Sequence, residues 1–414
     1  MNSEILSKGK KQIDSLSIFI LGVLIFISDD TILFGTNIDT NYLVFKYFAY
    51  FVVMIILLVR LRLDLIKDFS IYFLCVILVS ISLTSVFNLD FSGGYAYQAV
   101  VVLLAFLIVQ SLDFSLFSHI FTKYVFVLSL LSLLIFLVAS YFAWILDYFP
   151  TGENTAGVEF VTFYVGSVYR GVGEVRNASI FREPGVFAIY ILFAILFQLF
   201  LSVKINIKFI VCFFVALFST FSTAAFIAMS FAAVGYMFKD SASCFQSKIV
   251  LSALFFMIMA FVFGLQEDFY YKIFSKLDGD STSFGSLIAR AASIVVNFEI
   301  FKNNLLFGSG LRDYGALFQE YSILYFGESL EASGQSTNSY MSIFANFGLL
   351  YGLVVIWALI RLSGKLSDRF VVKAVLFVLL GLIFSSQDMR YSLFFYVLIF
   401  YGLKNYKSDF HRVA

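Results

Sequence analysis

The chain has 414 residues, of which 61% are hydrophobic and only 13% are charged, and its 28 Lys+Arg nearly balance its 27 Asp+Glu. A soluble domain carries about a quarter of charged residues to cover its surface, so this composition excludes a soluble enzyme. The lack of excess basic charge also excludes a nucleic-acid-binding protein, because the phosphate backbone is held by a basic surface.

Long apolar runs follow one another along the chain, and a helix of about 20 apolar residues spans a bilayer. Twelve runs lie near residues 15–34, 41–62, 70–88, 95–112, 120–148, 184–203, 205–220, 222–238, 248–265, 337–361, 370–387 and 389–404. The first run lacks a small-residue cleavage site, so we expect no cleavable signal peptide. The sequence predicts an all-α, polytopic integral membrane protein of about twelve transmembrane helices, with residues 1–414 forming a single transmembrane domain.

The connections between the runs alternate in charge. Lys and Arg are frequent at both termini and after each even-numbered run, whereas the short odd-numbered connections are poor in them and carry Asp29, Asp30, Asp39 and Asp90. Basic connections face the cytoplasm, so both termini are predicted to be cytoplasmic. Two long segments, 149–183 and 266–336, then lie on the external side and are predicted to be large periplasmic loops. Loops of this length are usually functional or disordered.

The first long segment holds three arginines and no lysine, namely Arg170, Arg176 and Arg182. Guanidinium groups grip phosphate and carboxylate in a bidentate fork. Pro184 suits the first turn of a helix whose N-terminus faces outward, and such a terminus attracts anions. These features favour an anion site. The alternative is that the arginines lie at lipid headgroups or pair with the acidic residues Glu153, Glu159, Glu174 and Glu183.

The second long segment repeats this arrangement with Arg290 and Arg312. It ends in a polar stretch in which Ser336 or Thr337 is a plausible helix N-cap. Gln335 and Asn338 are candidates for contacts with sugar hydroxyls, and an equally good interpretation of Asn338 is a capping amide. Gly308 and Gly310 are interpreted as turn residues.

Together these residues suggest an anionic substrate at the outer membrane–water interface, and a lipid-linked diphosphate fits. Glycosyl transfer from such a donor needs a stabilised departing diphosphate, which arginine supplies. Glu183 is the candidate general base, although a salt bridge to Arg182 or Arg176 is an equally good interpretation. The two histidines, His119 and His411, fall on predicted cytoplasmic connections.

No metal or cofactor site is predicted, because the sequence holds no histidine-rich site, P-loop or dinucleotide fingerprint, and its three cysteines show no CxxC spacing. Asp388 and Arg390 lie in the turn between the last two runs. They are interpreted as an ion pair or a helix end rather than as substrate contacts.

Three motifs resemble a known family. The segment 179–188 reads SIFREPGVFA and looks like the stretch before the mid-chain helix of Wzy-type O-antigen and capsular polysaccharide polymerases. The sequences FGSG at 307–310, TNSY at 337–340 and FGLLYG at 347–352 look like a later motif that these polymerases share with the O-antigen ligases. The twelve-span layout with two large periplasmic loops is similar too.

The resemblance implies a GT-C-like, inverting, metal-independent glycosyltransferase of the bacterial inner membrane. Its donor and acceptor would both be oligosaccharides linked to undecaprenyl diphosphate, and a chain-length regulator protein would be a further partner. Arg176 and Arg290 would be the essential arginines. Ligases carry a histidine before the asparagine, where this chain has Thr337, and this departure disfavours a ligase.

Three alternatives stand beside the polymerase. They are an O-antigen ligase, a flippase or transporter of lipid-linked oligosaccharide, and a structural or scaffold membrane protein, which gives no reason for arginines clustered on one face. A transporter is expected to carry charges inside several spans. Here the spans are nearly free of charge, apart from Lys46. The sequence does not separate O-antigen from capsule.

Overall fold

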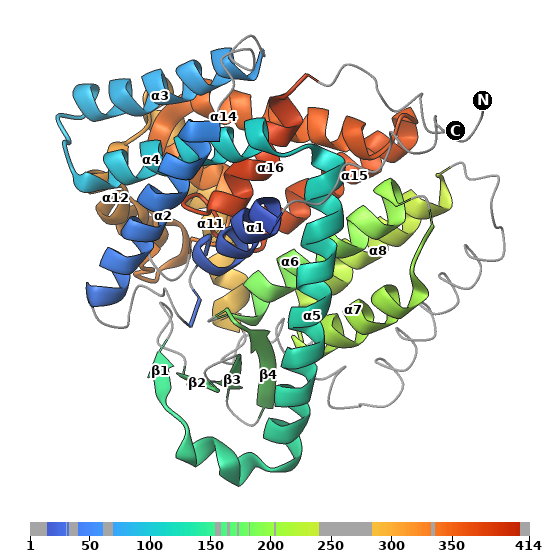
Figure 1. Cartoon of the computed structure of the whole chain (residues 1–414). Helices are drawn as coiled ribbons and strands as arrows, with labels where there is room; N and C mark the ends of the chain where they lie inside the picture. The colour runs from blue at the N-terminus through green and yellow to red at the C-terminus, as the bar shows by residue number, and fades with distance from the viewer. Residues whose placement is uncertain are drawn as a thin grey trace, which may run out of the picture.

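The computed structural model is mostly helical, with one small sheet (Figure 1). It describes residues 15–29, 31–32, 40–60, 69–153, 159–163, 166–171, 174–181, 183–202, 204–239, 284–332 and 336–405. The helices are α1 Ser15–Ile27, α2 Thr40–Arg60, α3 Ser70–Phe87, α4 Gly93–Ser111, α5 Phe114–Tyr141, η2 Ala143–Tyr148, α6 Pro184–Leu196, η3 Phe197–Leu201, α7 Ile207–Ser219, α8 Thr223–Met237, α11 Phe284–Asn303, α12 Gly310–Phe326, α14 Ser339–Leu366, α15 Phe370–Ser385 and α16 Leu393–Leu403.

Within the described residues, five helices are long and apolar enough to cross a membrane, and they are α3, α4, α5, α6 continued by η3, and α14. Shorter apolar helices occupy Ser15–Ile27, Phe45–Val59, Ile207–Ser219, Thr223–Met237, Phe370–Ser385 and Leu393–Leu403. Every predicted run in the described part therefore overlaps an apolar helix, but six of these helices are shorter than the five candidate spans. The run at 248–265 lies outside the described residues. This architecture agrees with a helical, multi-pass membrane protein.

The C-terminal ends of several helices gather at one end of the molecule, where lysines bind their carbonyl groups. Lys365 Nζ donates to the carbonyl oxygens of Tyr401 and Lys404, and Lys404 Nζ donates to that of Val109 at 2.7 Å. Lys239 Nζ bonds in the same way to Leu199 at 2.8 Å. The last carbonyl groups of a helix lack intrahelical partners and carry partial negative charge, so cations stabilise them. We call this the basic end.

The core is rich in aromatic residues and centres on α6 and α16, whose side chains are almost all buried. Phe394 of α16 stacks on Phe121 of α5, with ring centroids 5.1 Å apart, and on Tyr190 of α6 at 4.5 Å. Backbones also approach closely, because a Cβ atom on Gly402 would lie 2.2 Å from the carbonyl oxygen of Ala358 in α14. Small residues permit this contact between membrane helices.

The first predicted loop, 149–183, contains a four-stranded antiparallel sheet in the order β1–β2–β3–β4 (Figure 1). The strands are β1 Thr151–Glu153, β2 Glu159–Thr162, β3 Ser167–Gly171 and β4 Glu174–Ser179. The sheet packs on the last turns of α5 through a small cluster of buried residues, including Ala139, Leu146, Val161 and Val168. The sequence did not predict this sheet, which adds a β element to the expected helical fold.

Helix α14 is broken at Gly348, whose φ of 79° and ψ of −169° are not helical. The connection between α11 and α12 inserts at this break. Ser309 N donates to Ala345 O at 2.8 Å, and Leu349 N donates to Leu305 O at 2.9 Å. Gly308 also has a positive φ of 69°, in keeping with the predicted turn. These bonds fix the first half of α14, residues 339–347, against α11 and α12.

Candidate functional site

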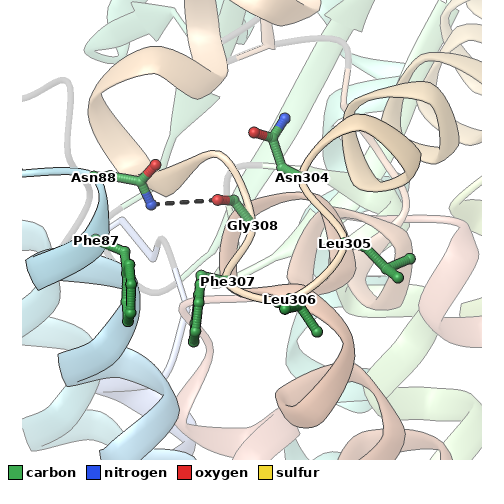
Figure 2. A pocket seen from close by; sticks show the side chains of 7 residues that line it. All are labelled: Phe87, Asn88, Asn304, Leu305, Leu306, Phe307 and Gly308. Carbon is green, nitrogen blue, oxygen red and sulfur yellow. Dashed lines mark hydrogen bonds between the residues drawn. The ribbon is translucent and has the colours of Figure 1, made fainter.

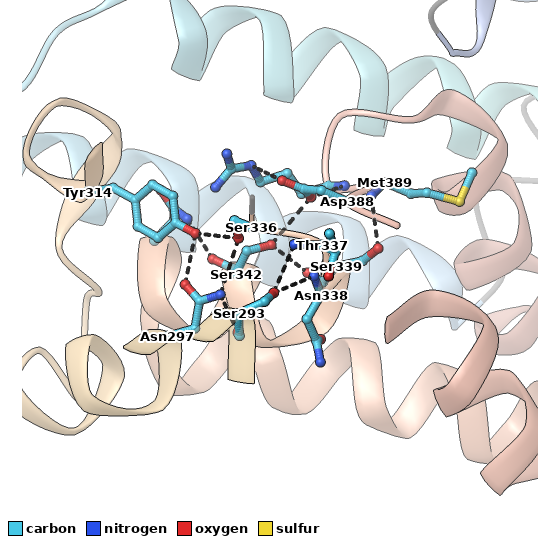
Figure 3. A network of polar contacts seen from close by, with 12 residues as sticks. Ser293, Asn297, Tyr314, Ser336, Thr337, Asn338, Ser339, Ser342, Asp388 and Met389 are labelled. Atoms are coloured by element: carbon cyan, nitrogen blue, oxygen red, sulfur yellow. Dashed lines mark hydrogen bonds and ion pairs between the residues drawn. The ribbon is translucent and has the colours of Figure 1, made fainter. Parts of the chain in front are cut away.

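A cluster of buried and partly buried polar side chains surrounds the N-terminus of α14 (Figure 3). It lies at the end of the molecule opposite the basic end. It draws on α11, α12, the start of α14 and the turn between α15 and α16. Its members are Ser293, Asn297, Tyr314, Ser336, Thr337, Asn338, Ser339, Ser342, Asp388 and Arg390. We call it the α14 cluster.

Helix α11 holds the chain that leads into α14. Ser293 Oγ accepts hydrogen bonds from the backbone N–H groups of Thr337 and Asn338, both at 2.8 Å. One turn further along, Asn297 Nδ2 donates to Ser336 Oγ at 3.2 Å and Tyr314 Oη donates to Asn297 Oδ1 at 2.8 Å. The helix start is therefore positioned by two neighbouring helices.

Asn338 is the N-cap of α14, because its Oδ1 accepts a hydrogen bond from Met341 N at 3.0 Å. The prediction of Ser336 or Thr337 as the cap is wrong by one or two residues, since Ser293 and Asn297 engage that part of the chain. Asn338 is fully buried, yet its Nδ2 has no hydrogen-bond partner within the described residues, and neither does Thr337 Oγ1. Figure 3 shows the Asn338 amide pointing away from Asp388.

Arg290 lies on the face of α11 that carries Ser293 and Asn297, since positions i, i+3 and i+7 share one side of a helix. Among the described residues, its half-buried guanidinium has no hydrogen-bond or ion-pair partner. Burial lowers the pKa of Arg290, because a charge removed from water loses its hydration. An unpaired, partly desolvated cation is costly, and an anionic ligand would relieve that cost.

Asp388 and Arg390 form a nearly enclosed ion pair on the other side of the cluster, with Arg390 Nε 3.0 Å from Asp388 Oδ2. The guanidinium also lies 4.7 Å from the ring centre of Tyr314, and Ser342 Oγ donates to Asp388 Oδ1 at 3.4 Å. Burial raises the pKa of Asp388, and the charge of Arg390 counteracts that rise. Arg390 Nη1 has no hydrogen-bond partner in the described part of the chain.

The turn that carries Asp388 also joins the starts of α14 and α6. Ser339 Oγ donates to Gln387 O at 2.6 Å. A Cβ atom on Gly185, the second residue of α6, would lie 2.2 Å from Gln387 Nε2. Glu183 has the extended backbone expected before a proline, and Pro184 opens α6 as predicted. The ends of both long segments therefore meet at Gln387. This places Glu183, Asn338 and the face of α11 that carries Arg290 in one region.

The remaining predicted arginines make contacts elsewhere. Arg170 pairs with Asp147 at 3.1 Å near the end of α5, and both side chains are largely exposed. Arg176 Nε donates to the carbonyl oxygen of Thr220 in the turn between α7 and α8, at 3.0 Å. Arg182 and Gln335 lie outside the described residues.

Arg312 has an exposed side chain, and its backbone N–H donates to Asp90 Oδ2 at 2.9 Å. Burial opposes the charge of Asp90, but hydrogen bonds from the N–H groups of Ser92 and Arg312 outweigh it and lower the pKa of Asp90. The start of α12 therefore already holds an anion, namely this carboxylate.

The sequence did not point to Ser293, Asn297 and Tyr314, and it gave a substrate role of Asp388 and Arg390 only as the less favoured alternative. Two signals were available. The polar residues of α11 recur at helical spacing, and the final connection places two opposite charges between apolar runs. Ionisable residues at membrane depth are rare and usually functional.

A family model described as O-antigen ligase matches residues 207–356, which is less than half of the chain. The matched part includes Arg290, Arg312 and Asn338, whereas Arg176, Glu183 and Asp388 lie outside it. No curated protein matches the chain. The family match supports a place for the chain in the superfamily of O-antigen ligases and polymerases, whose members are glycosyltransferase-like enzymes, and it is equally compatible with either activity.

Proposed function

We propose that the chain polymerises undecaprenyl-diphosphate-linked oligosaccharide repeat units into O-antigen or a related surface polysaccharide. The reaction is an inverting, metal-independent glycosyl transfer at the periplasmic face of the bacterial inner membrane. The observation that carries this proposal is Arg290 beside the start of α14, half-buried and without a partner among the described residues, within a segment that matches the ligase family model.

In this proposal Arg290 and the side-chain Nδ2 of Asn338, which bonds to no described residue, donate hydrogen bonds to oxygens of the donor's diphosphate. The acceptor hydroxyl oxygen attacks the anomeric carbon from the opposite face, and the bond from that carbon to the diphosphate oxygen breaks. Undecaprenyl diphosphate leaves with the bonding electrons. Negative charge grows on its oxygens as the bond breaks, so these donors stabilise the transition state more than the ground state.

The hydroxyl proton passes to a carboxylate. Glu183 was the candidate from the sequence, and Asp388 is a second candidate because it lies beside Gln387, which contacts both helix starts. Burial raises the pKa of Asp388, and a raised pKa makes its ionised carboxylate a better proton acceptor. Thr337 stands where ligases have histidine, so the residue type at this position favours the polymerase over the ligase.

The activity test uses the purified full chain in lipid nanodiscs with one defined lipid-linked repeat unit. A polymerase gives a ladder of products from this single substrate. A ligase gives products only when lipid A–core is added, and a flippase gives none in either case. A chelator is expected to leave the ladder unchanged, and strong inhibition would point to a metal site instead.

Arg290→Ala is expected to abolish the ladder. Arg290→Lys should restore it only in part, because an ammonium group cannot form the bidentate contact of a guanidinium with phosphate. Lys302→Ala is the matched control, because Lys302 is an exposed cation of the same helix that pairs with Glu299 at 3.1 Å. It should leave the ladder intact. A normal ladder from Arg290→Ala would refute the diphosphate site.

A further inference from the structure

A pocket lies away from the α14 cluster, where the end of α3 meets the connection between α11 and α12 (Figure 2). Its volume is about 320 Å³, and it is lined by Phe87, Asn88 and residues 304–308. This volume lies at the small end of ligand sites, which start at roughly 300 Å³. None of these lining residues is charged.

The pocket is held in shape by bonds between its walls. Thr84 Oγ1 donates to Phe307 O at 2.8 Å, and Asn88 Nδ2 donates to Gly308 O at 3.2 Å. On the far side the same connection is bonded to the break in α14. The site is therefore preformed, which lowers the entropic cost of binding a ligand.

The two amides of the pocket present mainly acceptors. Asn88 Nδ2 donates to Thr84 O at 2.9 Å and to Gly308 O. Its Oδ1 accepts no hydrogen bond from any described residue. Asn304 Nδ2 donates to Ile300 O at 3.0 Å. Its Oδ1 and its second side-chain N–H then remain available to a ligand. The hydrogen bonds fix which end of each amide is the NH₂ group, because a backbone carbonyl oxygen can accept a hydrogen bond from that group and not from Oδ1. In Figure 2 the amides of Asn88 and Asn304 flank Gly308, and both lie above the rings of Phe87 and Phe307 in that view.

The apolar part of the pocket is an aromatic stack with exposed neighbours. The rings of Phe87 and Phe307 are parallel within 7°, with centroids 3.9 Å apart, and Phe87 remains 60% exposed. Leu306 is 62% exposed beside them. A ligand here meets an apolar surface on one side and hydrogen-bond acceptors on the other.

We propose that this pocket binds an uncharged sugar ring of the membrane-bound glycan. A pyranose donates hydroxyl hydrogens from its edge and presents C–H groups on its face, which complements two amide oxygens and an exposed phenyl ring. A phosphate does not fit, because its oxygens would face carbonyl oxygens with no cation among the lining residues. A bare acyl chain would leave the amide oxygens unpaired.

The pocket's place in the fold suits a sugar remote from the diphosphate. The connection that lines it is bonded to Ala345 and Leu349, whereas Asn338, the proposed diphosphate contact, caps the start of α14. The helix half 339–347 between them spans about 13 Å. The source of the glycan rests on the proposed function, whereas the preference for an uncharged sugar can be measured without it.

The test uses the full chain in nanodiscs and three photoreactive probes that share one dodecyl tail with a diazirine. The head groups are glucosyl, phosphate and tri(ethylene glycol). Labelled peptides are identified by mass spectrometry. The glucosyl probe is expected to label residues 304–308 at a concentration about fivefold lower than the other two, as one added hydrogen bond implies. Soluble maltotriose should compete with it.

Asn304→Leu is expected to weaken glucosyl labelling about fivefold and to leave labelling by the ethylene glycol probe unchanged. Asn303→Leu is the matched control, since this neighbouring amide bonds to Tyr321 outside the pocket. Phe87→Leu, at an exposed position, provides a second variant with the same expected effect. Equal labelling by all three probes, or stronger labelling by the phosphate probe, would overturn the assignment.

The two proposals fail in different ways. Sugar-selective labelling without any polymer ladder would leave the pocket standing and refute the polymerase. A ladder without sugar-selective labelling would refute the pocket alone.

Discussion

Asp388 and Arg390 are charged residues with little contact with solvent, because their side chains are only 20% and 10% exposed. The sequence predicted an ion pair or a helix end here, and the structure shows the ion pair. Its surroundings were not predictable from nearby residues, since Tyr314 and Ser342 come from two other helices. Such surroundings depend on how α12 and α14 pack, which local patterns do not encode.

Asp388→Asn is expected to destabilise the protein by about 3–5 kcal/mol, because it leaves the buried guanidinium of Arg390 without a counter-charge. Arg390→Met should cost a similar amount. The double variant is expected to lose much less free energy of unfolding than the two single variants lose together, since no uncompensated charge remains. Unfolding of all four proteins in one detergent gives the coupling energy, and additive losses would show that the pair is not coupled.

At the scale of elements, the break in α14 follows from the sequence only after the structure is known. Phe347-Gly348 looks like part of one continuous apolar run. What breaks the helix is the inserted connection, whose Leu305 carbonyl accepts the N–H of Leu349. A glycine is needed at the break because φ is positive and the backbone of the connection comes close.

Gly348→Ala is expected to lower the melting temperature and the amount of folded protein. A Cβ atom there would lie 2.3 Å from the carbonyl oxygen of Leu306, which belongs to a fixed backbone. Gly381→Ala is the matched control, because this glycine of α15 has no atom within 4 Å of the added Cβ. It should be neutral or slightly stabilising. Equal melting temperatures for the two variants would contradict the close contact at the break.

The sheet was missed because its strands have only three to six residues, too few for a clear alternation of apolar and polar positions. The helix that carries it, α5, has 28 residues and is about 42 Å long, which exceeds a bilayer core of about 30 Å. Exposed apolar residues recur along one side of it at Val127, Leu130, Leu134, Leu137 and Tyr141. This stripe continues into η2, where Trp144 and Tyr148 are 62% and 80% exposed.

We expect η2 to lie at the membrane–water interface, where Trp and Tyr concentrate. The chain has two tryptophans, so Trp357→Phe leaves Trp144 as the single fluorescent reporter. Lipids brominated near the headgroup should quench Trp144 more strongly than lipids brominated near the chain ends. Trp144→Phe isolates Trp357, in the middle of the longer half of α14, and should show the reverse order. A Trp144 that neither lipid quenches would place η2 in water.

For the whole molecule, the alternation of charge along the sequence predicted two sides, and contacts in the structure group the helix ends in the same way. The basic end joins the C-terminal ends of α4, α14 and α16 through Lys365 and Lys404. The opposite end joins the starts of α6 and α14 at Gln387. The order of apolar runs was enough to predict this grouping. It was not enough to predict the α14 cluster, which needs contacts between residues as far apart as Ser293 and Thr337.

The predicted orientation, with both termini in the cytoplasm, can be measured by labelling single cysteines in intact cells. Ser92→Cys and Glu328→Cys, exposed at the opposite end, should react with a membrane-impermeant maleimide. Asp368→Cys and Lys208→Cys, exposed near the basic end, should react only after permeabilisation. The starting variant has Cys75, Cys212 and Cys244 replaced by serine to remove background. Labelling of Asp368→Cys in intact cells would reverse the orientation, and it would place the α14 cluster on the side where the proposed polymerisation does not occur.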